Sequence, residues 1–379
     1  MIVHMNVHMT DYFRSRHPCC QRAEIRRMFP TTESPNLVAE KRQKRPSMKD
    51  VAALASVSVQ TVSAVMNGKP GITEETSVRV REAIKQLGYR PDYTARSLRS
   101  GRRRTIALFV SDVANPVLGQ MASAAEDYAY GATYNLVLYN THDDPEREMS
   151  YVNMAAQGAV DGVLFVASKQ PHRGRDILEA VGIPSVTVDR IPESYTGPSV
   201  SLDNTKAGRL AAEHLLNLGH TRLSHIAAPY SLRLGRERQT GFVRAIEESG
   251  RAAEVYIETA GDWGCQPGYD AMQRLLDRVP DLTAMFAATD QAAIGAMHAI
   301  HDAGLQVPDD VSVVGLDNIE VAAFQNPPLT SIQQFLGQMG TLGVQMLLDI
   351  LTGKEPAQPQ IILEPELIVR QSTAPPRRR

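Results

Sequence analysis

The sequence predicts an α/β protein with a small all-α head at the N-terminal side and a larger body with parallel sheets. Three observations support this fold class. Residues 41–104 are strongly basic and contain three short helical patterns, whereas the rest of the chain is acidic. From Thr105 onward, apolar β-branched segments alternate with helical segments, which is typical of parallel strands covered by helices. The length of 379 residues is enough for two or three compact units.

The charge along the chain is distributed unevenly. Residues 41–104 contain 15 Lys and Arg against 5 Asp and Glu, whereas residues 105–379 contain 20 against 33. A basic module followed by an acidic body indicates that only the first module binds a polyanion. A basic surface that is merely solvated is the alternative.

Cysteine usage and hydropathy indicate a cytoplasmic protein without a membrane partner. Cys19, Cys20 and Cys265 fit neither a disulfide framework nor a zinc cluster, so we expect a reducing compartment. No segment reaches eighteen uninterrupted apolar residues, and the N-terminus has no continuous apolar signal core. Residues 1–45 show no sustained period, and we expect a disordered extension there.

Helix-start and helix-stop signals divide residues 46–92 into three helices. Ser47 begins the first helix in a capping-box pattern. A second helix is predicted from about Ser58 to Met66, and Thr73 caps a third helix that ends at Gly88. Three short helices with a tight break between the first two predict a helix-turn-helix, whose second helix enters the major groove of DNA.

The residues predicted to read bases lie at the start of the second helix: Ser58, Val59 and Gln60. Gln60 can pair with an adenine edge, and Val59 can pack on a thymine methyl group. A solvated helix residue is the alternative for Gln60. We expect phosphate contacts and local support from a second group of side chains: Lys49, Thr61, Ser63 and Lys69.

Residues 93–104 are predicted to form a hinge helix and a linker. The stretch YTARSLRS is too short to be a stable helix in water. Ala95 and Leu98 share one face and lie beside Arg96, and an apolar wedge beside arginine suits insertion into a minor-groove step. We expect this helix to form only on the DNA target, where two hinges lie side by side. A flexible linker is the alternative.

Seven apolar segments of the body predict strands that are buried on both faces: residues 105–112, 135–141, 162–168, 184–190, 223–229, 284–290 and 310–318. Polar residues follow several of them: Asp112, Thr141, Ser168, Asp189, Arg190, Asp290 and Asp317. Ligands of open α/β sheets bind outside the carboxyl ends of the strands, so these side chains predict a polar cleft. The alternative is that the aspartates cap the following helices, and Asp290 is the strongest case for that alternative.

Two stretches, SMKDVAALASVSVQTVSAVMNG and KQLGYRPDYTARSLRSGRRRTIALFVSDVANP, resemble the lactose-repressor/galactose-repressor (LacI) family of bacterial transcription regulators. The resemblance covers about residues 46–370. It implies a DNA-binding head, a hinge, and a two-lobed, periplasmic-binding-protein-like body over residues 105–370 that binds an effector and dimerises. Residues 371–379 are expected to be a tail too short for the tetramer-forming coil of some relatives, so we expect a homodimer.

The resemblance also implies an effector pocket between the lobes. Family positions match residues in the motifs DVANP, TVDR, RERQTGF, GDW, TDQAAIGAM and VGLDN: Asn115, Asp189, Arg238, Trp263, Thr289 and Asp317. Carboxylates, a guanidinium group and an indole face suit a sugar or sugar derivative. A purine or another metabolite is the alternative. Repression of transcription with release by the sugar is the commoner mode in the family.

Three residues depart from the family pattern. Ala64 stands where many members carry an arginine that contacts guanine, and alanine cannot hydrogen-bond a base. Ser56 replaces a common glycine in the turn, and Asp92 replaces the usual asparagine. The first departure predicts an altered or weaker operator preference at one position.

Other functional classes fit the sequence less well. A transporter's solute-binding protein needs an export signal and has no basic head. A dinucleotide-dependent enzyme needs a G-x-G-x-x-G turn early in the chain, whereas GQMGTLG at residues 337–343 has the wrong spacing. His214, His220 and His225 are spaced too irregularly for a metal site. We expect no catalysis, no cofactor and no metal.

Overall fold

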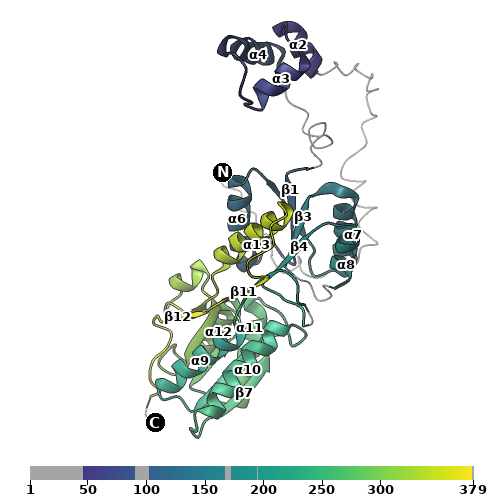
Figure 1. Cartoon of the computed structure of the whole chain (residues 1–379). Helices are drawn as coiled ribbons and strands as arrows, with labels where there is room; N and C mark the ends of the chain where they lie inside the picture. Colours follow the sequence, from purple (N-terminus) through teal and green to yellow (C-terminus); the bar gives the residue numbers. More distant parts are fainter. Residues whose placement is uncertain (1–45, 90–101, 167–171, 194, 378–379) are drawn as a thin grey trace, which may run out of the picture. The chain divides into compact units, whose positions relative to one another are not determined.

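The computed structural model describes residues 46–89, 102–166, 172–193 and 195–377. The chain divides into two compact units, Met1–Asp92 and Tyr93–Arg379, here called the head and the body (Figure 1). No helix in the described ranges is long and apolar enough to cross a membrane.

The head contains the three predicted helices: α2 (Met48–Ala55), α3 (Val59–Met66) and α4 (Glu74–Leu87). The predicted cap of α4 forms, because Thr73 accepts a hydrogen bond from the backbone N–H of Thr76. Ser58, which was predicted as the first residue of the second helix, caps α3 by accepting from the N–H of Thr61. The helices surround a small core of buried side chains: Val51, Ala52, Ala55, Val62, Val80, Ala83 and Tyr89. The helix-turn-helix prediction is therefore confirmed.

Ser56 lies in the turn between α2 and α3, at a position where glycine is common in the family that the sequence resembles. Its φ is 54°, in the left-handed region, where a side chain costs about 1–2 kcal/mol relative to glycine. The backbone N–H of Val57 still donates to Ala52 at 3.0 Å. The serine thus keeps the turn geometry with some backbone strain.

The first lobe of the body, here the N lobe, has six parallel strands in the order β11-β5-β4-β3-β1-β2. They are β1 (Thr105–Val110), β2 (Asn135–Asn140), β3 (Gly162–Phe165), β4 (Ser185–Val188), β5 (Ser199–Leu202) and β11 (Gln360–Leu363). Four helices cover the sheet: α6 (Pro116–Gly131), α7 (Pro145–Met154), α8 (His172–Ala180) and α13 (Leu336–Leu351). A π-helical turn, η1 (Ala155–Ala159), follows α7.

The second lobe, here the C lobe, has the strand order β12-β10-β9-β8-β6-β7. The strands of this lobe are β6 (Arg222–Ala227), β7 (Glu254–Thr259), β8 (Ala284–Ala287), β9 (Ser312–Asp317), β10 (Thr330–Gln333) and β12 (Glu366–Ile368). Its helices are α9 (Asn204–Asn217), α10 (Arg233–Glu248), α11 (Cys265–Arg278), α12 (Asp290–Asp302) and the 3-10 helix η2 (Glu320–Phe324). Figure 1 shows α9 and α10 packed side by side on this lobe.

The chain crosses between the lobes three times. It leaves the N lobe after β5, returns between β10 and α13, and ends in the C lobe with β12, which follows β11. Residues at these crossovers therefore contact both lobes. This arrangement is the predicted two-lobed, periplasmic-binding-protein-like body, and the fold class is confirmed.

Three details differ from the sequence expectations. Strand β2 lies at the edge of its sheet and alternates between exposed and half-buried residues, so it is not buried on both faces. Strand β12 pairs with β10 in the antiparallel direction, so the C-lobe sheet is mixed. Five short strands, β5, β7, β10, β11 and β12, were not predicted, because their apolar runs are short or interrupted by polar residues.

The segment after residue 370 is attached to the C lobe, contrary to the expected tail. Ser372 is fully buried, and its hydroxyl accepts from the N–H of Thr330 at 2.8 Å and donates to the carbonyl of Val313 at 2.6 Å. His220 contacts the carbonyl of Ala374 at 2.9 Å. The predicted boundary at residue 370 is therefore too early, because these hydrogen bonds make residues 371–377 part of the lobe.

Candidate functional site

The start of α3 presents the residues that the sequence predicts to read bases. Val59 is 37% exposed and Gln60 is also exposed, whereas Val62, one turn further on, is fully buried and anchors the helix. No acidic residue lies in the first turn, so no carboxylate there opposes a phosphate at the positive end of the helix dipole. The face is suited to a polyanion.

The hydroxyl side chains near this helix start are partly engaged within the head. Ser58 Oγ accepts from the N–H of Thr61 at 3.0 Å and lies 2.9 Å from its Oγ1. Ser63 Oγ lies 3.3 Å from the side-chain nitrogen of Asn67. Lys49 and Lys69 are exposed. The hinge residues Ala95, Arg96 and Leu98, together with Asp92, lie outside the described residues.

A narrow cavity, with about 20 Å³ of free volume, lies between the two lobes of the body. It is lined by residues from both lobes: Asn115, Val117, Leu118, Asp189, Arg190, Leu234, Arg238, Trp263, Thr289, Asp317 and Gln334. All six residues that the family resemblance assigned to an effector pocket are among them. Sequence reasoning did not assign the apolar residues, Arg190 or Gln334 to the pocket. Arg190 was noted only as a polar residue at a strand end.

Close packing of α9 and α10 positions Arg238. A Cβ atom on Gly208 would lie 2.0 Å from the carbonyl oxygen of Arg238, and one on Gly241 would lie 1.9 Å from that of Thr205. Only glycine allows this approach, which places Arg238 beside the crossover from β5 to α9. Its side chain is 2% exposed, and burial lowers the pKa of its guanidinium group, an effect that Asp317 and Asp189 oppose.

Hydrogen bonds join Arg238 to the C lobe and to two of the crossovers between the lobes. Its Nε donates to Asn204 Oδ1 at 2.9 Å and its Nη1 donates to the carbonyl of Ala288 at 2.7 Å. Gln334, on the second crossover, accepts from Arg238 Nη2 at 3.5 Å and donates to Asp189 Oδ1 at 2.7 Å. Arg238 therefore orders the wall of the cavity as well as facing it.

Asp317 and Asp290 form a buried pair of carboxyl groups at the end of β9. Burial raises the pKa of Asp317 well above its usual value, and the charge of Asp290 raises it further. Burial likewise raises the pKa of Asp290 to about 6. Asp290 accepts from Ser331 Oγ at 2.6 Å and from the N–H of Ile319 at 2.9 Å, whereas Thr289 caps α12. The capping alternative for Asp290 is therefore wrong.

Two predicted pocket residues also begin helices. Asn115 caps α6 by accepting from the N–H of Val117 at 3.0 Å. Thr289 caps α12 by accepting from the N–H of Ala292, and its hydroxyl donates to the carbonyl of Trp263 at 3.2 Å. The second contact fixes the loop that carries the indole ring.

The backbone around the cavity adopts strained conformations at several residues. Asp189, Asp317, Asn318 and Phe335 have φ values of 65°, 128°, 56° and 57°, in the left-handed half of the conformational map. Such residues cluster at ligand sites, because the surrounding structure must supply the energy that holds them. Their concentration at strand ends and at a crossover supports a binding role for the cleft.

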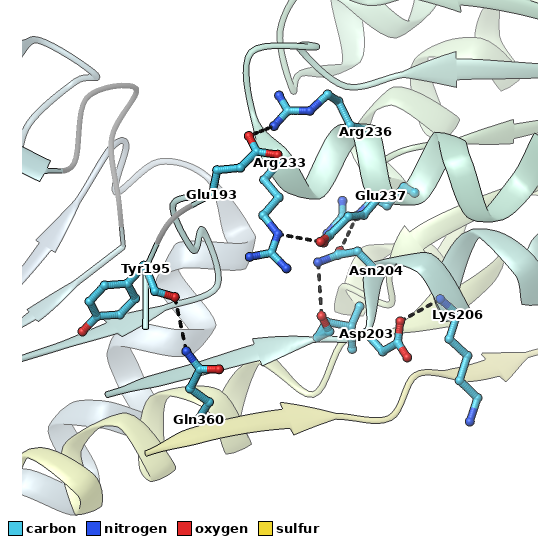
Figure 2. Close-up of polar contacts among 11 residues, drawn as sticks. Glu193, Tyr195, Asp203, Asn204, Lys206, Arg233, Arg236, Glu237 and Gln360 are labelled. Atoms are coloured by element: carbon cyan, nitrogen blue, oxygen red, sulfur yellow. Dashed lines mark hydrogen bonds and ion pairs between the residues drawn. The ribbon is translucent and has the colours of Figure 1, made fainter. Parts of the chain in front are cut away.

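A second, larger cavity of about 290 Å³ shares Asp189 and Leu234 with the first. Figure 2 shows the polar contacts beside it, where Asn204 lies between the strand end and α10. Glu193, from the loop that follows β4, forms an ion pair with Arg236 on α10. This pair joins the two lobes at the rim of the cleft.

A helix-turn-helix head and a two-lobed body with a polar cleft define a class of protein: a DNA-binding regulator controlled by a small ligand. Comparisons with known proteins agree with this class. Residues 47–92 match the model of bacterial regulatory proteins of the lacI family, and residues 212–373 match that of the periplasmic binding protein-like domain.

Curated relatives extend the match to most of the chain. The HTH-type transcriptional repressor PurR of Aliivibrio salmonicida (strain LFI1238) is 34% identical over 327 residues, which cover 86% of this chain and 98% of that protein. The repressor of the same name from Haemophilus influenzae (strain PittEE) is 34% identical over 330 residues, with the same coverage. The chain therefore belongs to the LacI family, and it is a DNA-binding transcriptional repressor with an effector-binding body.

Solved structures show the same architecture. A complex of the transcriptional regulator CelR with cellobiose has 33% sequence identity and a TM-score of 0.66, and the match covers 86% of this chain and 100% of that one. The Lac repressor dimer bound to operator and the anti-inducer ONPF has 28% identity and a TM-score of 0.79, over 87% and 100%. Operator DNA and a small-molecule effector are the partners that this family membership supplies.

Proposed function

We propose that this repressor responds to a sugar or sugar derivative bound in the cavity between the lobes. The observation that carries this proposal is the gathering of Asn115, Asp189, Arg238, Trp263, Thr289 and Asp317 around one cavity. Its polar groups include both hydrogen-bond donors and acceptors, as hydroxyl groups require, and its indole ring is an apolar surface. CelR, a relative at 33% identity, is known in complex with cellobiose.

The test of the effector class is a thermal-shift screen of the full chain against sugars and nucleobases. A ligand that binds only the folded body stabilises it by RT ln(1 + [L]/Kd), so the melting temperature rises with the logarithm of the ligand concentration above Kd. We expect sugars to stabilise the body and adenine, guanine and hypoxanthine to have no effect. Stabilisation by purines alone would exclude the carbohydrate assignment and favour a purine-responsive repressor.

In the head, we propose that Ser58, Val59 and Gln60 read bases from the start of α3. Thr61 and Ser63 then support this helix, while Lys49 and Lys69 hold phosphates. The exposure of Val59 and Gln60 supports this assignment. Gln60→Ala is expected to weaken specific binding about 10- to 100-fold with little change in nonspecific binding, as measured by fluorescence anisotropy on labelled duplexes. Equal loss on both duplexes would contradict base reading by Gln60.

We propose that the hinge, with Ala95, Arg96 and Leu98, inserts into the minor groove when two copies bind together. The wedge pattern of the sequence supports this role. Leu98→Ala should weaken specific binding well before nonspecific binding. Similar losses in both would exclude a wedge.

The domain plan and assembly complete the proposal. Residues 46–92 bind DNA, residues 93–104 connect, and the rest of the body binds effector and dimerises. A homodimer in the cytoplasm, where genomic DNA lies, would occupy a near-palindromic operator. The Lac repressor, at 28% identity, has been solved as a dimer on its operator. Light scattering should give twice the chain mass of 41.6 kDa, and a monomer at micromolar concentration would contradict this assembly.

A further inference from the structure

The chain enters the body through three consecutive arginines at residues 102–104, here called the entry segment, which lies directly before β1. This segment ends the stretch that the sequence predicts to be the hinge and its linker. All three arginines are exposed, so burial in an apolar core does not hold them. Hydrogen bonds must therefore fix the place and direction in which the chain enters the N lobe.

Asp161 makes the central contacts with the entry segment. One carboxylate oxygen accepts from the backbone N–H of Arg103 at 2.8 Å, and the other accepts from that of Arg104 at 2.7 Å. The backbone N–H of Asp161 donates to the carbonyl of Thr105 at 2.7 Å. Hydrogen bonds to a charged acceptor are roughly twice as strong as those between neutral groups, so one side chain firmly holds two successive peptide groups.

The local fold brings Asp161 to the entry segment. Asp161 lies directly before β3, which pairs in parallel with β1, so the two strands begin at the same edge of the sheet. The turn η1 precedes it, and Gly158 in this turn has a φ of 81°. A Cβ atom on Gly158 would lie 2.9 Å from Arg103 Nη2, so the absence of a side chain there leaves room for the arginine.

Two further segments of the N lobe hold the entry segment. Arg102 Nη2 donates to the carbonyl of Leu351, the last residue of α13, at 2.9 Å. Arg104 Nη1 donates to Thr133 Oγ1 at 3.0 Å, and the carbonyl of Arg104 accepts from the N–H of Asn135 at 2.8 Å. The entry segment is thus attached to the lobe at three places and moves with it.

The backbone of Arg104 shows that this attachment sets a direction. Its φ is 53°, in the left-handed region that side chains disfavour. Such a conformation persists where surrounding contacts hold it. Here the contacts are those of its N–H with Asp161 and of its carbonyl with Asn135, on the two sides of the same residue. Loss of the first contact would release the direction of the chain.

We propose that Asp161 is a positioning residue for operator binding, because it fixes the direction in which the chain leaves the N lobe towards the hinge. This inference rests on the proposed function of the hinge, which must reach one defined step of the minor groove. A chain that leaves the lobe in a fixed direction loses less conformational entropy when it binds the operator. Nonspecific binding depends on phosphate contacts and does not need this placement.

A carboxylate that only stabilises the lobe is the alternative, and Asp144 provides a matched control for it. Asp144 also lies in the N lobe, and its carboxylate also accepts from two successive N–H groups, those of Glu146 at 2.9 Å and Arg147 at 3.3 Å. It follows the carboxyl end of β2, at the opposite edge of the sheet from the entry segment. Asp144→Ala therefore removes similar bonds without releasing the entry segment.

The binding test uses the full chain and fluorescence anisotropy on two labelled duplexes. One duplex is the operator recovered by selection on genomic fragments, and the other has the same length and an unrelated sequence. Asp161→Ala should weaken operator binding about 10- to 100-fold, because two charge-assisted hydrogen bonds are lost. Its affinity for the unrelated duplex should change less than about 2-fold, and Asp144→Ala should change less than about 2-fold on both duplexes.

Two further measurements keep the test independent of folding defects. Asp161→Asn keeps one acceptor oxygen, so it should lose less operator affinity than Asp161→Ala, and it carries the test if the alanine variant does not fold. Melting temperatures should fall by similar amounts in Asp161→Ala and Asp144→Ala. A loss of operator affinity in the first alone then reports on position and not on stability.

Leu98→Ala, measured in the same assay, separates this inference from the proposed function. Full operator affinity in Asp161→Ala and Asp161→Asn would overturn the positioning role, and so would equal losses on the two duplexes or an equal operator loss in Asp144→Ala. Hinge insertion would survive these results if Leu98→Ala loses specific binding alone. Equal losses on both duplexes in Leu98→Ala would overturn hinge insertion, and with it the positioning role that depends on it.

Discussion

The two walls of the cavity differ in how completely their polar groups are paired. On the C-lobe wall, Arg238 donates through three nitrogen atoms, Thr289 caps a helix, and Asp317 accepts from the backbone of Asp290. On the N-lobe wall, Arg190 makes no hydrogen bond through Nη1 and is held by a 3.5 Å ion pair with Asp143 and by the ring of Trp263. Hydrogen bonds therefore fix the C-lobe wall, whereas an ion pair and a cation–π contact hold Arg190 in the N-lobe wall. Substitutions in the first should therefore reduce stability, and those in the second should reduce ligand affinity.

The largest expected effect is that of Arg238→Met on the stability of the body. This change leaves Asn204 Oδ1, the carbonyl of Ala288 and Gln334 Oε1 without their donor. Breaking a buried charged network by removing one partner costs about 3–5 kcal/mol. Urea unfolding followed by Trp263 emission measures the loss for the body alone. A variant as stable as the natural chain would show that this wall is not organised by Arg238.

A smaller effect is expected at His225, which lies on β6 in the C lobe. Burial lowers the pKa of its fully buried imidazole to about 4, and the ring stacks on Phe286 at a centroid distance of 4.8 Å. The unfolded chain binds this proton near pH 6.5 and the folded chain does not, so stability falls as the pH falls below that value. The contribution of this residue at pH 5 is a loss of about 2 kcal/mol.

His225→Phe should remove this pH dependence, because phenylalanine does not titrate. The difference in unfolding free energy between the variant and the natural chain should therefore shift by about 2 kcal/mol in favour of the variant between pH 7.5 and pH 5. A constant difference across this range would show that the histidine is protonated equally in both states. Asp290 and Asp317, with raised pKa values, act in the opposite direction in both chains and cancel in the comparison.

The smallest expected effect on stability is that of Arg190→Met. The guanidinium group makes no hydrogen bond through Nη1, and its ion pair with Asp143 is 3.5 Å long. Loss of the cation–π contact with Trp263 and of this long ion pair should lower the unfolding free energy without ligand by about 1–2 kcal/mol, less than in Arg238→Met. Urea unfolding beside Arg238→Met gives the comparison directly. Equal losses of unfolding free energy in the two variants would contradict the proposed difference between the two walls.

The sequence was sufficient for the elements whose signal is local. The cap at Thr73 and the seven strands with apolar, β-branched segments form as predicted. Strands β5 and β11 are four residues each and pair with segments far along the chain, so no local pattern distinguishes them. The segment after residue 370 was misjudged for a related reason, because its partners Thr330 and Val313 are distant in sequence.

The sequence predicts the residues of the candidate site that lie in family motifs, but it does not identify the other residues that line the cavity. The six residues assigned by resemblance line one cavity. Arg190 gave no such signal, because its contacts with Asp143 and Trp263 join positions 47 and 73 residues away. Asp290 looked like a helix cap until the structure placed Thr289 at that position and Ser331 against the carboxylate. Side-chain partners from distant strands decide such roles, and a single sequence does not contain them.

The most direct test of ligand control is the affinity of the full chain for its own operator, measured by fluorescence anisotropy. The measurement is made with and without the sugar that stabilises the body in the thermal-shift screen. The operator comes from selection on genomic fragments at low salt, where phosphate contacts are strongest. We expect saturating sugar to change the operator Kd about 5- to 150-fold. An operator Kd that stays the same at saturating sugar would contradict control of DNA binding through this cavity.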